Sequence, residues 1–172
     1  ASAFADTSAC ADEDQFSNLS VSVCFTVADA GGGNFTLTVD SISGVSSPKI
    51  FALGWKSDAT FVSGPAGETW GASSIPGAGF SPADWSHEVK RTGQPQNNGV
   101  GAQWTFVGDP GTNVVFHLAY GSNCSTWVAN SEFQTHPQSD AAGEGCGSTQ
   151  VPEPATLTLL GTGLIGIAGA VR

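Results

Sequence analysis

The chain has 172 residues and a formal net charge of −10, and only 12% of its residues are charged. Its five Lys and Arg residues are too few to form the basic cluster that binds nucleic-acid phosphates, so a nucleic-acid partner is excluded. Helix-favouring Lys, Arg and Glu are scarce, whereas 23 glycines accompany many Val, Thr and Phe residues, a balance that favours β-strands joined by Gly-rich turns.

The first residues are small and then acidic. "ASAFADTSAC" resembles the small-residue stretch around a signal-peptide cleavage point, so we expect the mature start of a secreted protein. Hard oxygen donors follow at Asp6, Asp12, Glu13 and Asp14, but they lack the regular spacing of a calcium-binding loop. We therefore predict no metal site, and no pattern in the sequence indicates a cofactor.

The clearest predicted elements are two early strands. Apolar and polar residues alternate over 19–27, where Val23 and Phe25 share a face, and again over 34–42, where Leu37 and Val39 do so. The segment "ADAGGGN" separates the two runs and suits a turn. This pattern predicts an antiparallel hairpin.

Further strands are predicted along the chain at 48–57, 59–64, 101–108, 112–120 and 125–133. A long Gly- and Pro-rich connection covers 64–85, with a short strand around Trp70, and "WSHEVKRT" fits either a strand or one helical turn. Short strands at regular spacing predict an all-β fold, an antiparallel β-sandwich resembling a jelly roll. We assign this domain to 1–134, a polar linker to 135–151 and an apolar tail to 152–172.

Four cysteines form an even set without the close pairs that zinc ligands usually make. They are Cys10, Cys24, Cys124 and Cys146. We expect two disulfides, as in proteins of oxidising compartments. Three connectivities are open, and the pairing of sequence neighbours is preferred.

Catalytic residues are not indicated. His87, His117 and His136 are scattered, and His117 lies on a strand, where a histidine is more often structural than catalytic. The acids at Asp84, Glu88, Asp109 and Glu132 have no spacing that suggests a catalytic pair, and we expect them to be solvated surface acids. The sequence predicts a protein that is not an enzyme and has no catalytic residues.

Exposed aromatic rings offer a candidate glycan-binding surface, because rings stack on the apolar faces of sugars. Of the five tryptophans, Trp70 and Trp85 flank a Gly-rich connection, and loops are where sandwich domains tend to bind. These two are the candidate glycan-binding residues, and exopolysaccharide is the candidate partner.

The C-terminal segment "VPEPATLTLLGTGLIGIAGAVR" contains seventeen uncharged residues from Ala155 to Val171, the lower limit for a membrane-spanning helix. It resembles the PEP-CTERM sorting signal of Gram-negative bacteria, in which a Pro-Glu-Pro motif, here Pro152, Glu153 and Pro154, precedes an apolar span. The resemblance is specific over 151–172. It implies export to the cell surface or the extracellular matrix, recognition by an exosortase, and at least transient contact with the membrane. The family's tail ends in several basic residues, whereas this one has Arg172.

From these observations we expect an exported structural protein that assembles with copies of itself into a filament or matrix through its tail. The alternative is a glycan-binding matrix protein anchored by a membrane-spanning tail. The tail could bundle as helices or donate a strand to a neighbour's sheet. Its assembly residues are the large apolar ones: Leu157, Leu159, Leu160, Leu164, Ile165, Ile167 and Val171.

Overall fold

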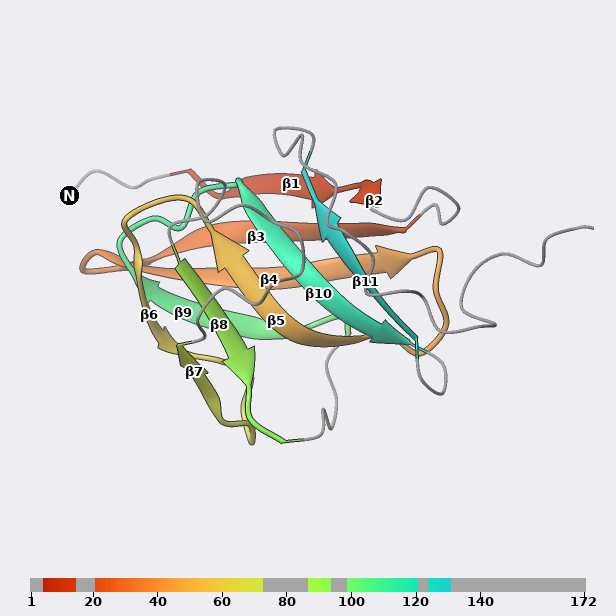
Figure 1. Ribbon diagram of the computed structural model, residues 1–172. Helices are drawn as coiled ribbons and strands as arrows, with labels where there is room; N and C mark the ends of the chain where they lie inside the picture. The colour runs from red at the N-terminus through yellow and green to blue at the C-terminus, as the bar shows by residue number, and fades with distance from the viewer. Residues whose placement is uncertain (1–4, 15–20, 73–86, 94–98, 121–123, 131–172) are drawn as a thin grey trace, which may run out of the picture.

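A computed structural model describes residues 5–14, 21–72, 87–93, 99–120 and 124–130, which form two antiparallel sheets packed face to face (Figure 1). The five-stranded sheet has the order β1 (Thr7–Ala11), β3 (Ser22–Gly31), β4 (Asn34–Ser43), β9 (Gln103–Val107) and β6 (Thr60–Ser63). The six-stranded sheet has the order β2 (Glu13–Asp14), β11 (Cys124–Ala129), β10 (Val114–Tyr120), β5 (Lys49–Trp55), β8 (His87–Arg91) and β7 (Trp70–Ala72). The predicted antiparallel β-sandwich is confirmed.

The predicted hairpin is β3 and β4. Gly31, Gly32 and Gly33 make its turn with φ of 86°, 66° and 81°, a region that residues with a Cβ rarely enter. The Asp29 carboxylate accepts a hydrogen bond of 2.8 Å from the Gly31 amide and so holds the turn. The glycine run therefore fixes where the chain reverses.

Alternation along the strands builds the core between the sheets. Val23, Phe25 and Val27 of β3 are buried, and so are the corresponding apolar residues of β4. The Phe25 ring meets Phe116 of β10 edge to face, with 5.5 Å between ring centroids. Trp104 of β9 is fully buried beside them. The faces predicted from the sequence are those that meet in the core.

Two uncertain segments are strands. "WSHEVKRT" contains β8, which pairs with β5 on one side and β7 on the other. The short strand expected near Trp70 is β7. In β5, an irregularity in the pairing with β10 falls between His117 and Leu118, and it leaves Phe51 as an extra residue between Ile50 and Ala52. No helix in the described ranges is long and apolar enough to cross a membrane.

The linker predicted at 135–151 and the tail at 152–172 lie outside the described residues. The sorting motif and the apolar assembly residues of the tail therefore lie outside the described residues too. The same holds for Trp85, the second candidate glycan-binding residue.

Candidate functional site

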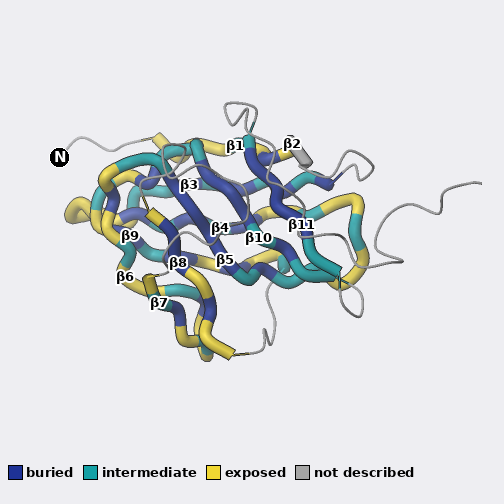
Figure 2. Tube along the Cα trace, in the orientation of Figure 1, coloured by how far each residue is buried: buried dark blue, intermediate teal, exposed yellow. Residues whose placement is uncertain are grey.

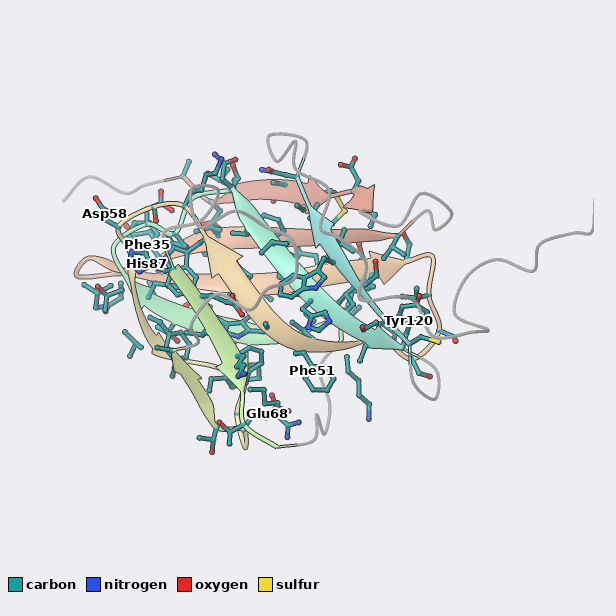
Figure 3. All side chains as sticks on the ribbon, viewed as in Figure 1. Phe35, Phe51, Asp58, Glu68, His87 and Tyr120 are labelled. Carbon is teal, nitrogen blue, oxygen red and sulfur yellow. A yellow bond between two sulfur atoms is a disulfide. The ribbon has the colours of Figure 1, made fainter. Side chains whose placement is uncertain are left out.

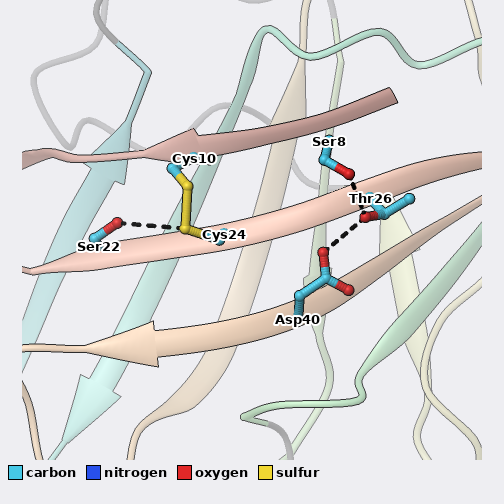
Figure 4. Close-up of a disulfide and its surroundings, with 6 residues drawn as sticks. All are labelled: Ser8, Cys10, Ser22, Cys24, Thr26 and Asp40. Carbon is cyan, nitrogen blue, oxygen red and sulfur yellow. Dashed lines mark hydrogen bonds between the residues drawn. A yellow bond between two sulfur atoms is a disulfide. The ribbon is translucent and has the colours of Figure 1, made fainter. Parts of the chain in front are cut away.

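A disulfide links the edge strand β1 to its neighbour β3 in the five-stranded sheet (Figure 4). Cys10 of β1 lies opposite Cys24 of β3 in the register, and their sulfur atoms are bonded. This is the pairing of sequence neighbours that we preferred. Cys124 is also in a disulfide, but its expected partner Cys146 lies outside the described residues, so the second pair stays a prediction.

The outer face of the five-stranded sheet carries small hydroxyl side chains. The residues that share this face, by register, include Ser8, Ser22, Thr26, Thr36, Thr38, Thr60, Ser63 and Thr105. The five strands contain no Lys, Arg, Glu or His. Their two acids are Asp29, at the hairpin turn, and Asp40, on the outer face. We call this surface the hydroxyl face.

Hydrogen bonds order the hydroxyl face. The Thr26 hydroxyl donates to Asp40 over 2.7 Å, so the Ser8 hydroxyl, 2.9 Å from Thr26 Oγ1, must be the donor in that contact (Figure 4). Gln103 Nε2 donates to Thr38 Oγ1 over 3.3 Å. These bonds cross from strand to strand, which fixes the side-chain rotamers across the sheet.

An open cavity of about 430 Å³ adjoins this face. It is lined by Pro65 and Ala66, which follow β6, and by residues 99–103, which lead into β9. Gln103 belongs to both the cavity and the hydroxyl face. Val100, another lining residue, is 65% exposed.

The outer face of the six-stranded sheet has a different character. Ala52, Val115, Trp127 and Ala129 point away from the core between the sheets, yet each is at most 3% exposed. The His117 ring stacks on Trp127 with 4.3 Å between centroids and 3° between planes. On its other side lies Phe51, at 5.9 Å, which the irregularity in β5 brings to this face (Figure 3).

Glu88 of β8 belongs to the same outer face, since it lies opposite Gly54, which in turn pairs with Val115. Its side chain is buried, and Oε1 has no hydrogen-bond partner among the described residues. Burial raises the pKa of the Glu88 carboxyl from its ordinary value of 4.5 to about 7, and the charge of Lys90 opposes that rise. Sequence reasoning treated Glu88 as a solvated surface acid, and this was wrong.

Trp70, a candidate glycan-binding residue, lies in the core instead. Its ring meets Trp104 edge to face at 5.3 Å, and its Nε1 donates to Glu68 over 2.9 Å. Gly64 lies so close to the ring that a Cβ there would overlap it. Glu68 also makes a buried ion pair of 3.0 Å with Arg91. Trp70 is 9% exposed, so it offers no open ring face to a sugar.

Two histidines lie in the described ranges, and each contacts a tryptophan ring. His87 of β8 stacks on Trp55 at 5.5 Å, and His117 stacks on Trp127. Within the described ranges, no three His, Cys, Asp or Glu side chains gather as a metal ion would require. Of the two, His87 is exposed and His117 is half-buried.

Comparison with known proteins identifies one segment. Residues 150–172 match the family model of the PEP-CTERM protein-sorting motif. No curated protein and no solved structure matches the chain. The match includes the Pro152, Glu153 and Pro154 signature and the apolar span that follows it. The chain therefore ends in a PEP-CTERM protein-sorting motif, which marks an exosortase substrate and an exported protein associated with the cell surface.

Proposed function

We propose that this protein is a structural subunit of the cell surface or extracellular matrix, and that it assembles with copies of itself through its apolar tail. The observation that carries the proposal is the sorting motif at 150–172, because it marks an exported protein associated with the cell surface. A rigid, disulfide-bonded sandwich precedes the motif.

The tail supplies the assembly contact in this proposal. Burial of the seventeen uncharged residues from Ala155 to Val171 away from water is favourable, and in the proposed assembly another copy of the chain buries them. A tail from one copy that contacts the body or tail of the next is a head-to-tail contact, and such contacts give open filaments unless the rotation closes into a ring.

Two geometries suit this contact. Gly163, Gly166 and Gly169 recur every third residue, and on a helix they form a strip on which another backbone can approach closely. An extended tail could instead pair with a sheet edge, and β1 (Thr7–Ala11) is the longest edge strand among those described. Either geometry requires the large apolar side chains of the tail.

Electron microscopy of the full chain beside a chain that ends at Val151 tests the proposal. We expect filaments or a regular matrix from the full chain and monomers from the shortened one. The full-length variant Leu164→Asp, which places a charge in the apolar run, should also stay monomeric. Its control, Gln150→Asp, adds the same charge before the Pro-Glu-Pro signature and outside the apolar run, and should assemble normally. If the unmodified full chain stays monomeric in detergent-free buffer, the proposal is wrong.

We also propose that the protein acts without catalysis. In support, both described histidines are stacked on tryptophan rings, and Glu88, the one described acid with a strongly raised pKa, faces apolar neighbours at Gly54 and Val115. Screening of the purified protein on glycoside, peptide and ester substrates should show no turnover. An activity that disappears in Glu88→Gln or His117→Phe would contradict this proposal.

A further inference from the structure

One row of polar side chains crosses four strands of the hydroxyl face in continuous register. Ser8 lies opposite Thr26, Thr26 opposite Thr38, and Thr38 opposite Gln103. Adjacent strands are about 4.8 Å apart, so the row extends over roughly 14 Å. We call these four residues the hydroxyl track, and we propose that it binds an uncharged polysaccharide.

The cavity lies at the end of the track. Ser63 of β6 pairs with Thr105 of β9, so a continued ladder would place residue 65 opposite Gln103. β6 ends at Ser63 instead, and the cavity of about 430 Å³ opens between Pro65 and Gln103. A chain of sugars that follows the track across the strands would reach this cavity. The exposed Val100 at its wall offers an apolar contact to a sugar ring.

The charges select the class of polymer. The protein carries a net charge of −10, and the strands of the hydroxyl face contain no Lys or Arg, so an anionic polymer would be repelled. A cationic polymer would find only Asp40 on this face, next to Thr26. An uncharged polymer is not repelled and needs no acidic partners. Its hydroxyls can both donate hydrogen bonds to this face and accept them from it.

The track is ordered before a ligand arrives. Ser8 donates to Thr26, Thr26 donates to Asp40, and Gln103 donates to Thr38. Fixed rotamers lower the entropy cost of binding. Each hydroxyl oxygen keeps a lone pair for a ligand, and Gln103 also keeps its carbonyl oxygen and one amide hydrogen.

Hydrogen bonds from this face are individually weak, since each replaces a bond to water. The aromatic residues of these strands are turned into the core, as Phe25, Trp104 and Phe106 show, so no ring of the five described strands adds stacking energy. Useful affinity must come from many contacts along one chain. The track therefore fits a polymer and not a single sugar.

Affinity electrophoresis of the folded full chain tests this site. Native gels would contain dextran or hydroxyethyl cellulose as uncharged polymers with different linkages, alginate as an anionic polymer, or no polymer. We expect retardation in at least one uncharged gel and none in alginate. The double variant Thr38→Val, Gln103→Leu removes two polar groups of the track and should raise the dissociation constant about tenfold.

The control is Thr7→Val, which makes the same kind of change on the opposite face of β1 and should bind as the unmodified protein does. Equal melting temperatures of the three proteins show that folding is not the cause. The inference is overturned if neither uncharged polymer retards the protein, if alginate alone does, or if the double variant is retarded as strongly as the control.

Discussion

The two sheets of the sandwich differ in what their outer faces present. The five-stranded sheet turns hydroxyls such as Thr36 and Ser63 to solvent, whereas the six-stranded sheet has Val115 and Trp127 buried on the side away from the core. Figure 2 shows the difference, since β5, β10 and β11 are mostly dark blue. One sheet is therefore buried on a single face, and the other on both faces.

This difference follows from the composition of the strands. β4 alternates from Asn34 to Val39, with Thr36 and Thr38 outside and Leu37 inside, which is the pattern of a half-exposed antiparallel strand. β10 begins with three consecutive apolar residues, Val114, Val115 and Phe116, all buried. A continuous apolar run is typical of a strand covered on both sides. Substitutions on the two outer faces should thus have very different costs.

The largest effect is expected from a charge on the buried outer face. Val115→Asp would leave an unpaired carboxylate at a position that is 1% exposed, and should lower the free energy of unfolding by about 4 kcal/mol. Thr36→Asp makes a similar change on the hydroxyl face and should cost less than about 0.5 kcal/mol. Urea denaturation of both variants measures the difference. Equal losses would refute the comparison between the faces.

A second prediction concerns the edge of the exposed sheet. β1 has solvent on its outer face, so its attachment relies on the Cys10–Cys24 bond, which spans a sequence separation of 14. Replacing both cysteines with serine should lower the free energy of unfolding by about 3 kcal/mol, since the unfolded chain gains the freedom of an open loop. Urea denaturation measures the loss, and hydrogen exchange should accelerate at β1 amides. The control is Ser22→Ala, beside Cys24. A stability unchanged by the double substitution would contradict this role.

The third prediction is a pH dependence from the buried outer face. The pKa of Glu88 is about 7 in the folded protein and near 4.5 when unfolded, so the folded state holds the proton more tightly. The stability that this group contributes is complete below about pH 4.5 and is lost as the pH rises through about 7. Glu88→Gln, which is neutral at every pH, should therefore be more stable than the unmodified protein at pH 8, by about 2 kcal/mol, and similar at pH 4.

The measurement is urea denaturation of both proteins at each pH, because the difference between them cancels the contribution of the other acids. A constant difference from pH 4 to pH 8 would show that Glu88 reaches water in the folded state. That result would also weaken the description of this face as buried.

Much of the fold could be predicted from the sequence, because alternation is a local signal. The runs through Phe25 and Leu37 assigned both strand and face correctly. "WSHEVKRT" could not be resolved, since its strand is set by pairing with β5, far away in the sequence. The irregularity that turns Phe51 to the outer face likewise arises only when β5 pairs with β10.

The candidate sites were harder to predict than the fold. Trp70 borders a Gly-rich connection, yet its place in the core depends on Trp104 and on a close approach by Gly64. Glu88 is buried opposite Gly54 of a strand far away in the sequence, which no local pattern reveals. The hydroxyl track was also missed, because its four members lie on four different strands and only the register shows that they form one row. The sorting motif could be found because it is a contiguous sequence signal.

The smallest expected effect is on the exposed face and tests whether its hydrogen bonds order it. Thr26→Val removes the hydroxyl that joins Ser8 to Asp40, and should lower the free energy of unfolding by about 0.5 to 1 kcal/mol. Valine keeps the shape and the strand preference of threonine, so the loss reports the hydrogen bonds. The control, Thr36→Val, lies across the same pair of strands opposite Ala28, and should be neutral within about 0.3 kcal/mol. If the two variants have the same free energy of unfolding, the hydrogen bonds that join Ser8, Thr26 and Asp40 stabilise the protein no more than hydrogen bonds to water would. The exposed face is then held by its backbone ladder alone.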